Sequence, residues 1–353
     1  MEDQPKTGKC VQAQVWPKLK ELMRSLEAVR KRWANLTARS RGQTGQTRHD
    51  QTEQQRITVQ RSTDDVEDVE FQLELPSSTV LHRCAFPLLR LGNAREKLED
   101  AKGIAVISFN KEPVNSMNLD FWKALKSTFE AAEADKTIRG VVFQSTLKKN
   151  IFTAGLDINE LYAPSTSEER LKDFWTTLTQ TLTSIYRSRL ATVAAINGAC
   201  PAGGCALAMC CDWRIITWEG SMGLNEVALG IPVPRNWCEL MMKITGQHPA
   251  EDLLLSASMP QSTDLRQIGL VDDIVEKPEE LLPMALERLK KWLKFPPQGF
   301  SITKRHLRDE FAKRWVGGIK EEAEEVWRAV SDPRSVKALD VVIKRLHGAH
   351  AKL

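Results

Sequence analysis

Glu226 is the side chain best placed in this sequence to do acid–base chemistry. It stands in the segment GLNEVALGIP (223–232), where most neighbouring residues are apolar. Burial among such residues raises the pKa of a carboxylate and makes it a better general base near neutral pH. A solvated loop glutamate is the alternative on local sequence alone. Asn225, directly before it, either lines a binding pocket or makes ordinary loop hydrogen bonds.

Two further segments contain glycine where a strand should hand over to a helix. They are FTAGLDINEL (152–161) and INGACPAGGCALAMCCD (196–212). Glycine allows positive φ and lets the backbone approach a ligand closely, and the first N–H groups of a helix have no partner inside it. Two such turns can aim two backbone amides at one oxygen atom. Neither segment has the spacing of a nucleotide-binding motif. We interpret Asp157 as a helix cap in preference to a ligand contact.

Four of the seven cysteines lie close together, at Cys200, Cys205, Cys210 and Cys211. No C-x-x-C pair occurs among them, no histidine lies nearby, and the residues between them resemble a turn that runs into a buried helix. We therefore expect buried, reduced thiols and no metal site.

Basic residues form two short runs with two possible roles. Lys148 and Lys149 are one run, and the segment SITKRHLRDE (301–310) contributes Lys304, Arg305 and Arg308. Such residues can bind the phosphates of a ligand, but a solvated helix face is the commoner explanation. His306 in the same segment is interpreted as solvated and not catalytic.

Strand and helix patterns alternate along the middle of the chain, which predicts an α/β fold with buried parallel strands. Beyond Gly246 the pattern is mainly helical, with one extended piece at 270–276. The predicted strands are 103–110, 139–146 and 192–198, and the predicted helices are one capped by Asn118, one at 167–188 and two near the end at 319–330 and 335–346.

The composition of the chain limits the class of protein to which it can belong, and its first hundred residues differ from the rest. The chain has 353 residues, is 42% hydrophobic and 27% charged, and has no apolar run long enough for a membrane helix. Its net charge of +4 does not favour nucleic acid as a partner. We divide it into an N-terminal extension (1–93), a core (94–295) and a C-terminal helical region (296–353). Within the extension we expect an amphipathic basic helix at 15–35 and a disordered linker at 37–56.

Three motifs in order resemble the crotonase (enoyl-CoA hydratase/isomerase) superfamily, and within it the monofunctional Δ3,Δ2-enoyl-CoA isomerases. They are A-G-L-D (154–157), A-I-N-G-A-C-P-A-G-G (195–204) and G-L-N-E-x-x-L-G-I (223–231). The resemblance covers about residues 100–350. It implies a spiral of ββα units, a C-terminal helical region used in trimerisation, and an acyl-CoA substrate. It implies no metal and no separate cofactor, because coenzyme A is part of the substrate.

The resemblance also implies roles for individual residues. Backbone N–H groups of Ala154 and Gly203 would form an oxyanion hole for the thioester oxygen, and Glu226 would move a proton from C2 to C4 of a 3-enoyl-CoA. The implied substrate-binding residues are Ala154, Gly155, Leu156, Asp157, Ile158, Gly203 and Asn225.

One departure from the family pattern favours an isomerase over a hydratase. Hydratases of this superfamily have a second carboxylate in G-G-G-C-E-L, whereas the matching residue here is Ala206. The pair of carboxylates that positions water is therefore missing. A hydratase or acyl-CoA thioester hydrolase of the same fold, and a non-catalytic crotonase-like binding protein, stay as alternatives.

The last three residues suggest a cellular address. Ala351-Lys352-Leu353 resembles the Ser-Lys-Leu signal of peroxisomal proteins. We expect the peroxisomal matrix, with the mitochondrial matrix as the alternative.

Overall fold

The computed structural model describes residues 71–74 and 102–350, which belong to the second of two units of the chain. The helix predicted at 15–35, the linker predicted at 37–56 and the terminal tripeptide lie outside the described residues. None of the described helices is long and apolar enough to cross a membrane.

A six-stranded sheet forms the centre of the fold. Its order is β1 (Phe71–Glu74), β2 (Ile104–Phe109), β3 (Gly140–Ser145), β4 (Ala191–Ile196), β6 (Trp213–Thr217) and β8 (Asp273–Val275). All neighbours are parallel except β1, which pairs antiparallel with β2. Two short strands, β5 (Ala199–Pro201) and β7 (Ser221–Gly223), form a second parallel sheet. The α/β prediction is confirmed, but the edge strand β1 comes from within the segment that the sequence assigned to the extension.

The helices follow the order that the sequence predicts, with additional ones between, of which α11 is the longest. They are α3 (Leu119–Ala134), α4 (Ile158–Leu161), α5 (Glu168–Tyr186), α6 (Gly203–Cys210), α7 (Arg235–Thr245), α8 (Gln247–Ser256), α9 (Ser262–Gln267), α10 (Leu281–Leu293), α11 (Pro297–Gly317), α12 (Ile319–Ser331) and α13 (Pro333–His350), with 3-10 turns η1 (Glu226–Leu229) and η2 (Pro278–Glu280). Side-chain caps start three of them, namely α3, α4 and α5. Asn118 accepts a hydrogen bond from the Phe121 N–H at 3.0 Å, and Ser167 accepts one from the Arg170 N–H at 3.1 Å.

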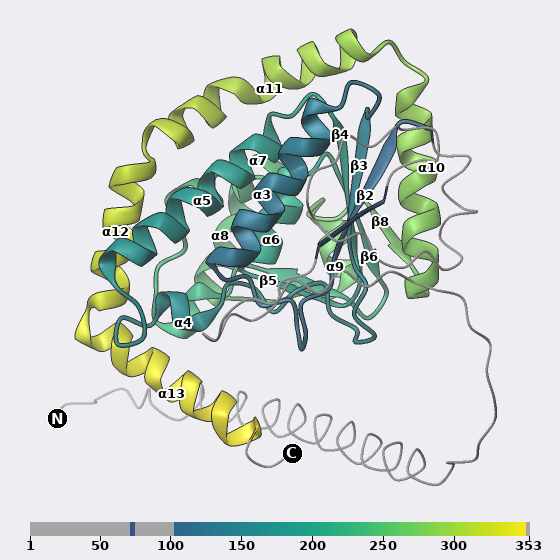
Figure 1. Cartoon of the computed structure of the whole chain (residues 1–353). Helices are drawn as coiled ribbons and strands as arrows, with labels where there is room; N and C mark the ends of the chain where they lie inside the picture. The colour runs from purple at the N-terminus through teal and green to yellow at the C-terminus, as the bar shows by residue number, and fades with distance from the viewer. Residues whose placement is uncertain (1–70, 75–101, 351–353) are drawn as a thin grey trace, which may run out of the picture. The chain divides into compact units, whose positions relative to one another are not determined.

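Helices cover both faces of the sheet (Figure 1). α10 packs on one face, while α3, α5 and α6 lie on the other. Strand β2 shows the reason, because Ile104 and Val106 face α10 whereas Ala105, Ile107 and Phe109 face the opposite layer. Both sides of the strand are therefore apolar, as expected of a buried parallel sheet.

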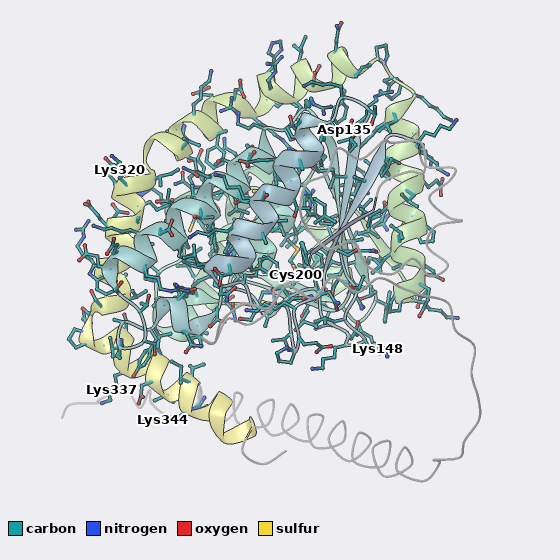
Figure 2. The ribbon with its side chains drawn as sticks, viewed as in Figure 1. Asp135, Lys148, Cys200, Lys320, Lys337 and Lys344 are labelled. Carbon is teal, nitrogen blue, oxygen red and sulfur yellow. The ribbon has the colours of Figure 1, made fainter. Side chains whose placement is uncertain are left out.

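The C-terminal helices cover their own chain. α11 and α12 pack along α5, and α13 packs against η1, where the Ser335 hydroxyl donates to the Gly230 carbonyl at 3.1 Å. Leu339 of α13 is buried, whereas Lys337 and Lys344 project outward (Figure 2). Packing of these helices on a neighbouring subunit stays a prediction.

A buried ion cluster fastens α11 to the sheet. Lys304 Nζ lies 2.7 Å from Asp212 Oδ2, and Arg308 lies 2.8 Å from Asp212 Oδ1. Lys304 also donates to the Leu190 carbonyl at 2.9 Å. The interpretation of this run as a solvated face is therefore wrong for Lys304 and Arg308, because a carboxylate from a distant segment receives them. Arg305 and His306 of the same helix are exposed, as predicted.

Candidate active site

A cavity of about 430 Å³ contains most of the residues that the sequence singles out. Its lining is mainly apolar and comes chiefly from residues 111–116, α4 and the loop before it, α5, η1, α7, α12 and α13. The predicted residues in the lining are Ala154, Leu156, Asp157, Ile158, Asn225 and Glu226. Gly155 and Gly203 are buried beside it. The fold thus brings together three segments that are separate in the sequence.

Glu226 is the first residue of η1 and reaches this cavity with only 4% of its surface exposed. Neither carboxylate oxygen has a hydrogen-bond partner among the described residues. Burial without a compensating cation raises the pKa of Glu226 to about 7. A carboxylate with this pKa gives and takes a proton readily near neutral pH.

The other carboxylates of the lining are already engaged. Glu112 lies at the exposed mouth, 3.8 Å from Lys149. Asp157 accepts a hydrogen bond from the Ser116 hydroxyl at 2.6 Å and caps α4 by accepting one from the Asn159 N–H at 3.0 Å. The cap interpretation of Asp157 is confirmed. Glu226 is therefore the best general base in this lining.

The first glycine turn corrects one prediction from the sequence. The N–H of Ala154 donates to the Val114 carbonyl at 2.9 Å, so it is not available to bind a substrate oxygen. Its assignment as an oxyanion donor does not hold in this structure. Gly155 has a φ of +88°, a value that glycine adopts easily, and it turns the chain after Ala154.

Leu156, two residues further on, has the free N–H that Ala154 lacks. Met117 pairs beside it in a short parallel bridge, donating to the Gly155 carbonyl at 2.9 Å and accepting from the Asp157 N–H at 3.2 Å. Backbone groups alternate in direction along an extended segment, so the Leu156 N–H points away from Met117. No described residue accepts a hydrogen bond from it.

The second glycine turn places another free N–H beside the first. Gly203 begins α6, so its N–H has no partner within the helix, and the helix dipole favours negative charge there. Ala202 before it has a φ of +49°, a strained value for a residue with a side chain. A Cβ atom added to Gly203 would approach Leu156 Cδ2 to 2.5 Å. The two turns are therefore in contact, and a larger residue in the second would displace the Leu156 side chain.

Ala206 and the clustered cysteines have no group to offer the cavity. Ala206 lies fully buried in α6 and is not part of the cavity lining. Cys200, Cys205, Cys210 and Cys211 are buried free thiols, and burial raises the pKa of each. Among the described residues no three His, Cys, Asp or Glu side chains are arranged to hold a metal ion.

Sequence reasoning missed the apolar wall of the cavity. Trp175 of α5 stacks on Trp237 of α7 with ring centroids 5.9 Å apart and an interplanar angle of 22°. Val326 and Val330 of α12, and Ile343 of α13, complete this wall. The only available signal was apolar spacing along each helix, and that spacing equally describes ordinary core residues.

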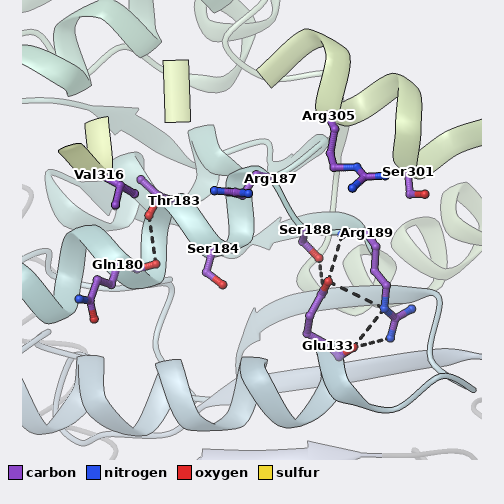
Figure 3. A pocket seen from close by; sticks show the side chains of 10 residues that line it. All are labelled: Glu133, Gln180, Thr183, Ser184, Arg187, Ser188, Arg189, Ser301, Arg305 and Val316. Atoms are coloured by element: carbon purple, nitrogen blue, oxygen red, sulfur yellow. Dashed lines mark hydrogen bonds and ion pairs between the residues drawn. The ribbon is translucent and has the colours of Figure 1, made fainter. Parts of the chain in front are cut away.

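A second hollow, of about 620 Å³, lies between α5, the end of α3 and α11 (Figure 3). Its lining is mostly polar and includes Arg187, Arg189 and Arg305. Arg189 donates to backbone carbonyls, among them that of Ile138 at 2.8 Å, and lies 3.8 Å from the Glu133 carboxylate. Neither the predicted base nor an oxyanion donor lies in this hollow, so the smaller cavity is the candidate active site.

Comparison with known sequences matches the part of the chain that contains the candidate site. A model of the enoyl-CoA hydratase/isomerase family matches residues 99–338. Mitochondrial enoyl-CoA delta isomerase 1 of Homo sapiens is 33% identical over 261 residues, which cover 73% of this chain and 85% of that protein. The crotonyl-CoA hydratase of Syntrophomonas wolfei is 32% identical over 187 residues, which cover 53% of this chain and 70% of that protein.

Solved structures resemble the fold over a similar range. The crystal structure of human mitochondrial delta3-delta2-enoyl-CoA isomerase has a TM-score of 0.67 at 32% identity and covers 71% of this chain and 96% of its own. The crystal structure of enoyl-CoA hydratase from Bacillus halodurans has a TM-score of 0.63 at 23% identity, and the match covers 68% of this chain and 96% of that chain. The second likeness is one of fold alone.

Proposed function

The chain belongs to the enoyl-CoA hydratase/isomerase family, and we propose that it is an isomerase that converts 3-enoyl-CoA to (2E)-enoyl-CoA. The family assignment confirms the crotonase fold expected from the three motifs. The observation that carries the proposed reaction is Glu226, a single buried carboxylate without partners in a largely apolar cavity. Oxidation of unsaturated fatty acids is the metabolism that needs this reaction.

Two backbone amides stabilise the charge that develops during the reaction. Removing a proton from C2 of the substrate produces a dienolate, whose negative charge lies largely on the thioester oxygen. The N–H groups of Leu156 and Gly203 are free and lie on two turns in contact with each other. They are our candidates for the oxyanion hole. One such donor typically contributes about 10²- to 10³-fold to the rate.

Glu226 moves the proton. Its carboxylate takes the proton from C2 and breaks that C–H bond, the double bond shifts from C3–C4 to C2–C3, and the protonated side chain returns the proton to C4. A pKa near 7 suits both halves of this transfer, because the side chain must first accept and then donate. The substrate and product have the same atoms and the same oxidation level. The proposed reaction therefore needs neither a redox cofactor nor added water.

The absence of a second free carboxylate favours isomerisation over hydration. Adding water to a 2-enoyl-CoA requires a group that positions the water as well as one that transfers the proton. Ala206 has only a methyl group at the matching position, and Asp157 is held by Ser116 and by the start of α4. Among the described residues of the lining, Glu226 would be the only buried carboxylate able to position a water molecule.

Product analysis tests the proposal directly. We expect purified full-length protein to convert 3-hexenoyl-CoA to (2E)-hexenoyl-CoA, a product of unchanged mass with a conjugated double bond. Incubation with (2E)-hexenoyl-CoA should give little 3-hydroxyhexanoyl-CoA. A product heavier by one water as the main outcome would assign hydration instead, release of free CoA would assign hydrolysis, and binding without turnover would assign a non-catalytic role.

Assembly and address are proposed on separate grounds. We propose a homotrimer, by resemblance to the family, which a mass measurement in solution tests. The similar human isomerase is named as mitochondrial, which supports the mitochondrial alternative over the peroxisomal expectation. Imaging the full-length chain with an N-terminal fluorescent tag decides between the two organelles.

A further inference from the structure

Glu322 is a second buried carboxylate near the cavity, and the proposed reaction does not use it. It lies in α12 with 7% of its surface exposed, and no cation of the described residues forms an ion pair with it. Burial raises the pKa of Glu322, and hydrogen bonds to its carboxylate oppose that rise. An apolar residue of similar size would avoid the desolvation that a buried carboxylate suffers. The role of Glu322 therefore depends on the hydrogen bonds that its carboxylate accepts.

These contacts join three helices. Asn236 of α7 donates to Glu322 Oε1 at 3.1 Å, and the indole N–H of Trp315 in α11 donates to Oε2 at 3.3 Å. Trp315 is fully buried. Each carboxylate oxygen thus receives one N–H group from a different helix, and neither donor faces solvent freely.

We call Glu322, Asn236 and Trp315 the junction. On both α7 and α12, residues that line the cavity lie close to this junction in the chain. On α7 the next residue after Asn236 is Trp237, which stacks on Trp175. On α12, Val326 follows Glu322 by one helical turn and Val330 by two, so all three lie on one face of the helix. The junction therefore fixes the separation between the indole wall and the valine wall.

The apolar part of the cavity is larger than the proposed chemistry requires. Only the first four carbons of an acyl chain take part in moving the double bond, and these must lie beside Glu226. The lining continues through Trp175, Trp237 and α12 to Ile343 of α13. A longer acyl tail would occupy this space, and the separation of its walls would determine how well the tail packs.

We propose that Glu322 is a positioning residue that holds α12 against α7 and thereby sets the preference of the cavity for long acyl tails. The inference rests on the proposed function for the identity of the ligand as an acyl-CoA. Removing the carboxylate leaves the Asn236 and Trp315 donors without an acceptor, which favours entry of water and separation of the two helices. Contacts to the far carbons of a long tail are lost, while those to a short tail stay intact.

Binding of saturated acyl-CoA molecules tests this role without requiring turnover. Titration calorimetry would compare butanoyl-CoA with decanoyl-CoA on the full-length wild type, Glu322→Ala, Glu322→Gln and the matched control Glu321→Gln, whose side chain is exposed on the same helix. In Glu322→Ala we expect decanoyl-CoA to bind about 10-fold more weakly, the equivalent of losing one or two buried methylene groups. Butanoyl-CoA should change by less than about twofold, since the same methylene contacts are absent.

The variants separate positioning from general stability. Glu322→Gln keeps one acceptor oxygen and should fall between wild type and alanine, and Trp315→Phe, which removes only the indole N–H donor, should shift the decanoyl preference in the same direction. These two decide the matter if Glu322→Ala does not fold. The proposed role of Glu322 would be overturned if the folded variants bound both ligands more weakly by the same factor. It would also be overturned if they kept the wild-type preference for decanoyl-CoA over butanoyl-CoA. Failure of the isomerase assay with the wild type would instead reject the proposed function and leave this binding result readable.

Discussion

Two buried carboxylates, Asp212 and Glu226, show how the same functional group serves opposite purposes in this molecule. Asp212 lies between Lys304 and Arg308, with ion-pair distances of 2.7 and 2.8 Å, and also accepts hydrogen bonds from Thr192. Burial alone would raise its pKa, but the two cations outweigh burial and the pKa of Asp212 is lowered. Glu226 is buried without such cations beside it, and its pKa is raised to about 7.

The difference teaches that partners, and not burial alone, decide whether a carboxylate holds the fold together or does chemistry. Asp212 stays ionised and ties α11 to the sheet. Glu226 is poised to exchange a proton, and its lack of partners is a cost to stability that the proposed chemistry requires.

Replacing Glu226 with Gln should give the largest effect on activity. The variant keeps the shape of the side chain but cannot accept a proton, so kcat for 3-hexenoyl-CoA should fall by about 10²- to 10⁴-fold. Glu112→Gln at the exposed mouth is the matched control and should retain turnover near that of the wild type. Steady-state kinetics check both, and a Glu226→Gln enzyme with wild-type kcat would rule out the proposed base.

Replacing Lys304 with Met should give the largest effect on stability. It leaves Asp212 buried with only Arg308, and removing one partner of a buried ion pair typically lowers the free energy of unfolding by about 3–5 kcal/mol. Urea denaturation measures the change. Arg305→Met, at the exposed neighbouring position, should change the free energy of unfolding by no more than about 0.5 kcal/mol. Equal effects of the two substitutions would contradict the assignment of Lys304 to a buried cluster.

The raised pKa of Glu226 predicts how pH acts on both activity and stability. Because the base must be deprotonated, kcat/KM should rise as pH increases through about 7. The pKa of this group is higher in the folded state than its ordinary 4.5, so its stabilising contribution is present below pH 4.5 and is lost as pH rises through 7. Between pH 4.5 and 7, the free energy of unfolding of Glu226→Gln should therefore increase relative to that of the wild type. The increase should be about 1.4 kcal/mol for each unit by which the pKa of Glu226 is raised. A pH-independent difference between the two proteins would contradict the raised pKa.

Removing the Thr192 hydroxyl beside Asp212 should give the smallest effect. This hydroxyl donates to Asp212 Oδ2 at 3.0 Å and accepts from the Asp212 N–H at 3.0 Å, and both cations stay in place when it is lost. Thr192→Val should lower the free energy of unfolding by about 1–3 kcal/mol, less than Lys304→Met does. Chemical denaturation at neutral pH compares them, and a larger loss in Thr192→Val would mean that the hydroxyl outweighs the cations.

Local pattern predicted the elements of the core well. The apolar runs at 103–110 and 139–146 form β2 and β3, and Asn118 caps α3 as its position before an amphipathic segment indicates. Glu226 was singled out because a carboxylate in an apolar segment is exceptional, and the resemblance to the crotonase superfamily implied its role as the base. The edge strand β1 was missed although Phe71 and Leu73 alternate with Gln72 and Glu74 as in a strand, because a pattern of four residues is too short to stand out without its partner β2.

The sequence by itself determined which segments become strands and helices, because these depend on residue spacing and on residue types near each other in the chain. That the three motifs lie at one site was implied only by their resemblance to a known family, and the folded structure brings them together. Tertiary structure decided which backbone amides are free. Ala154 loses its N–H to Val114, whereas the bridge with Met117 leaves that of Leu156 available. It also decided that Lys304 is buried. The reason is physical: the direction of a hydrogen bond and the burial of a charge depend on partners that lie far away along the chain and become neighbours only in the folded protein.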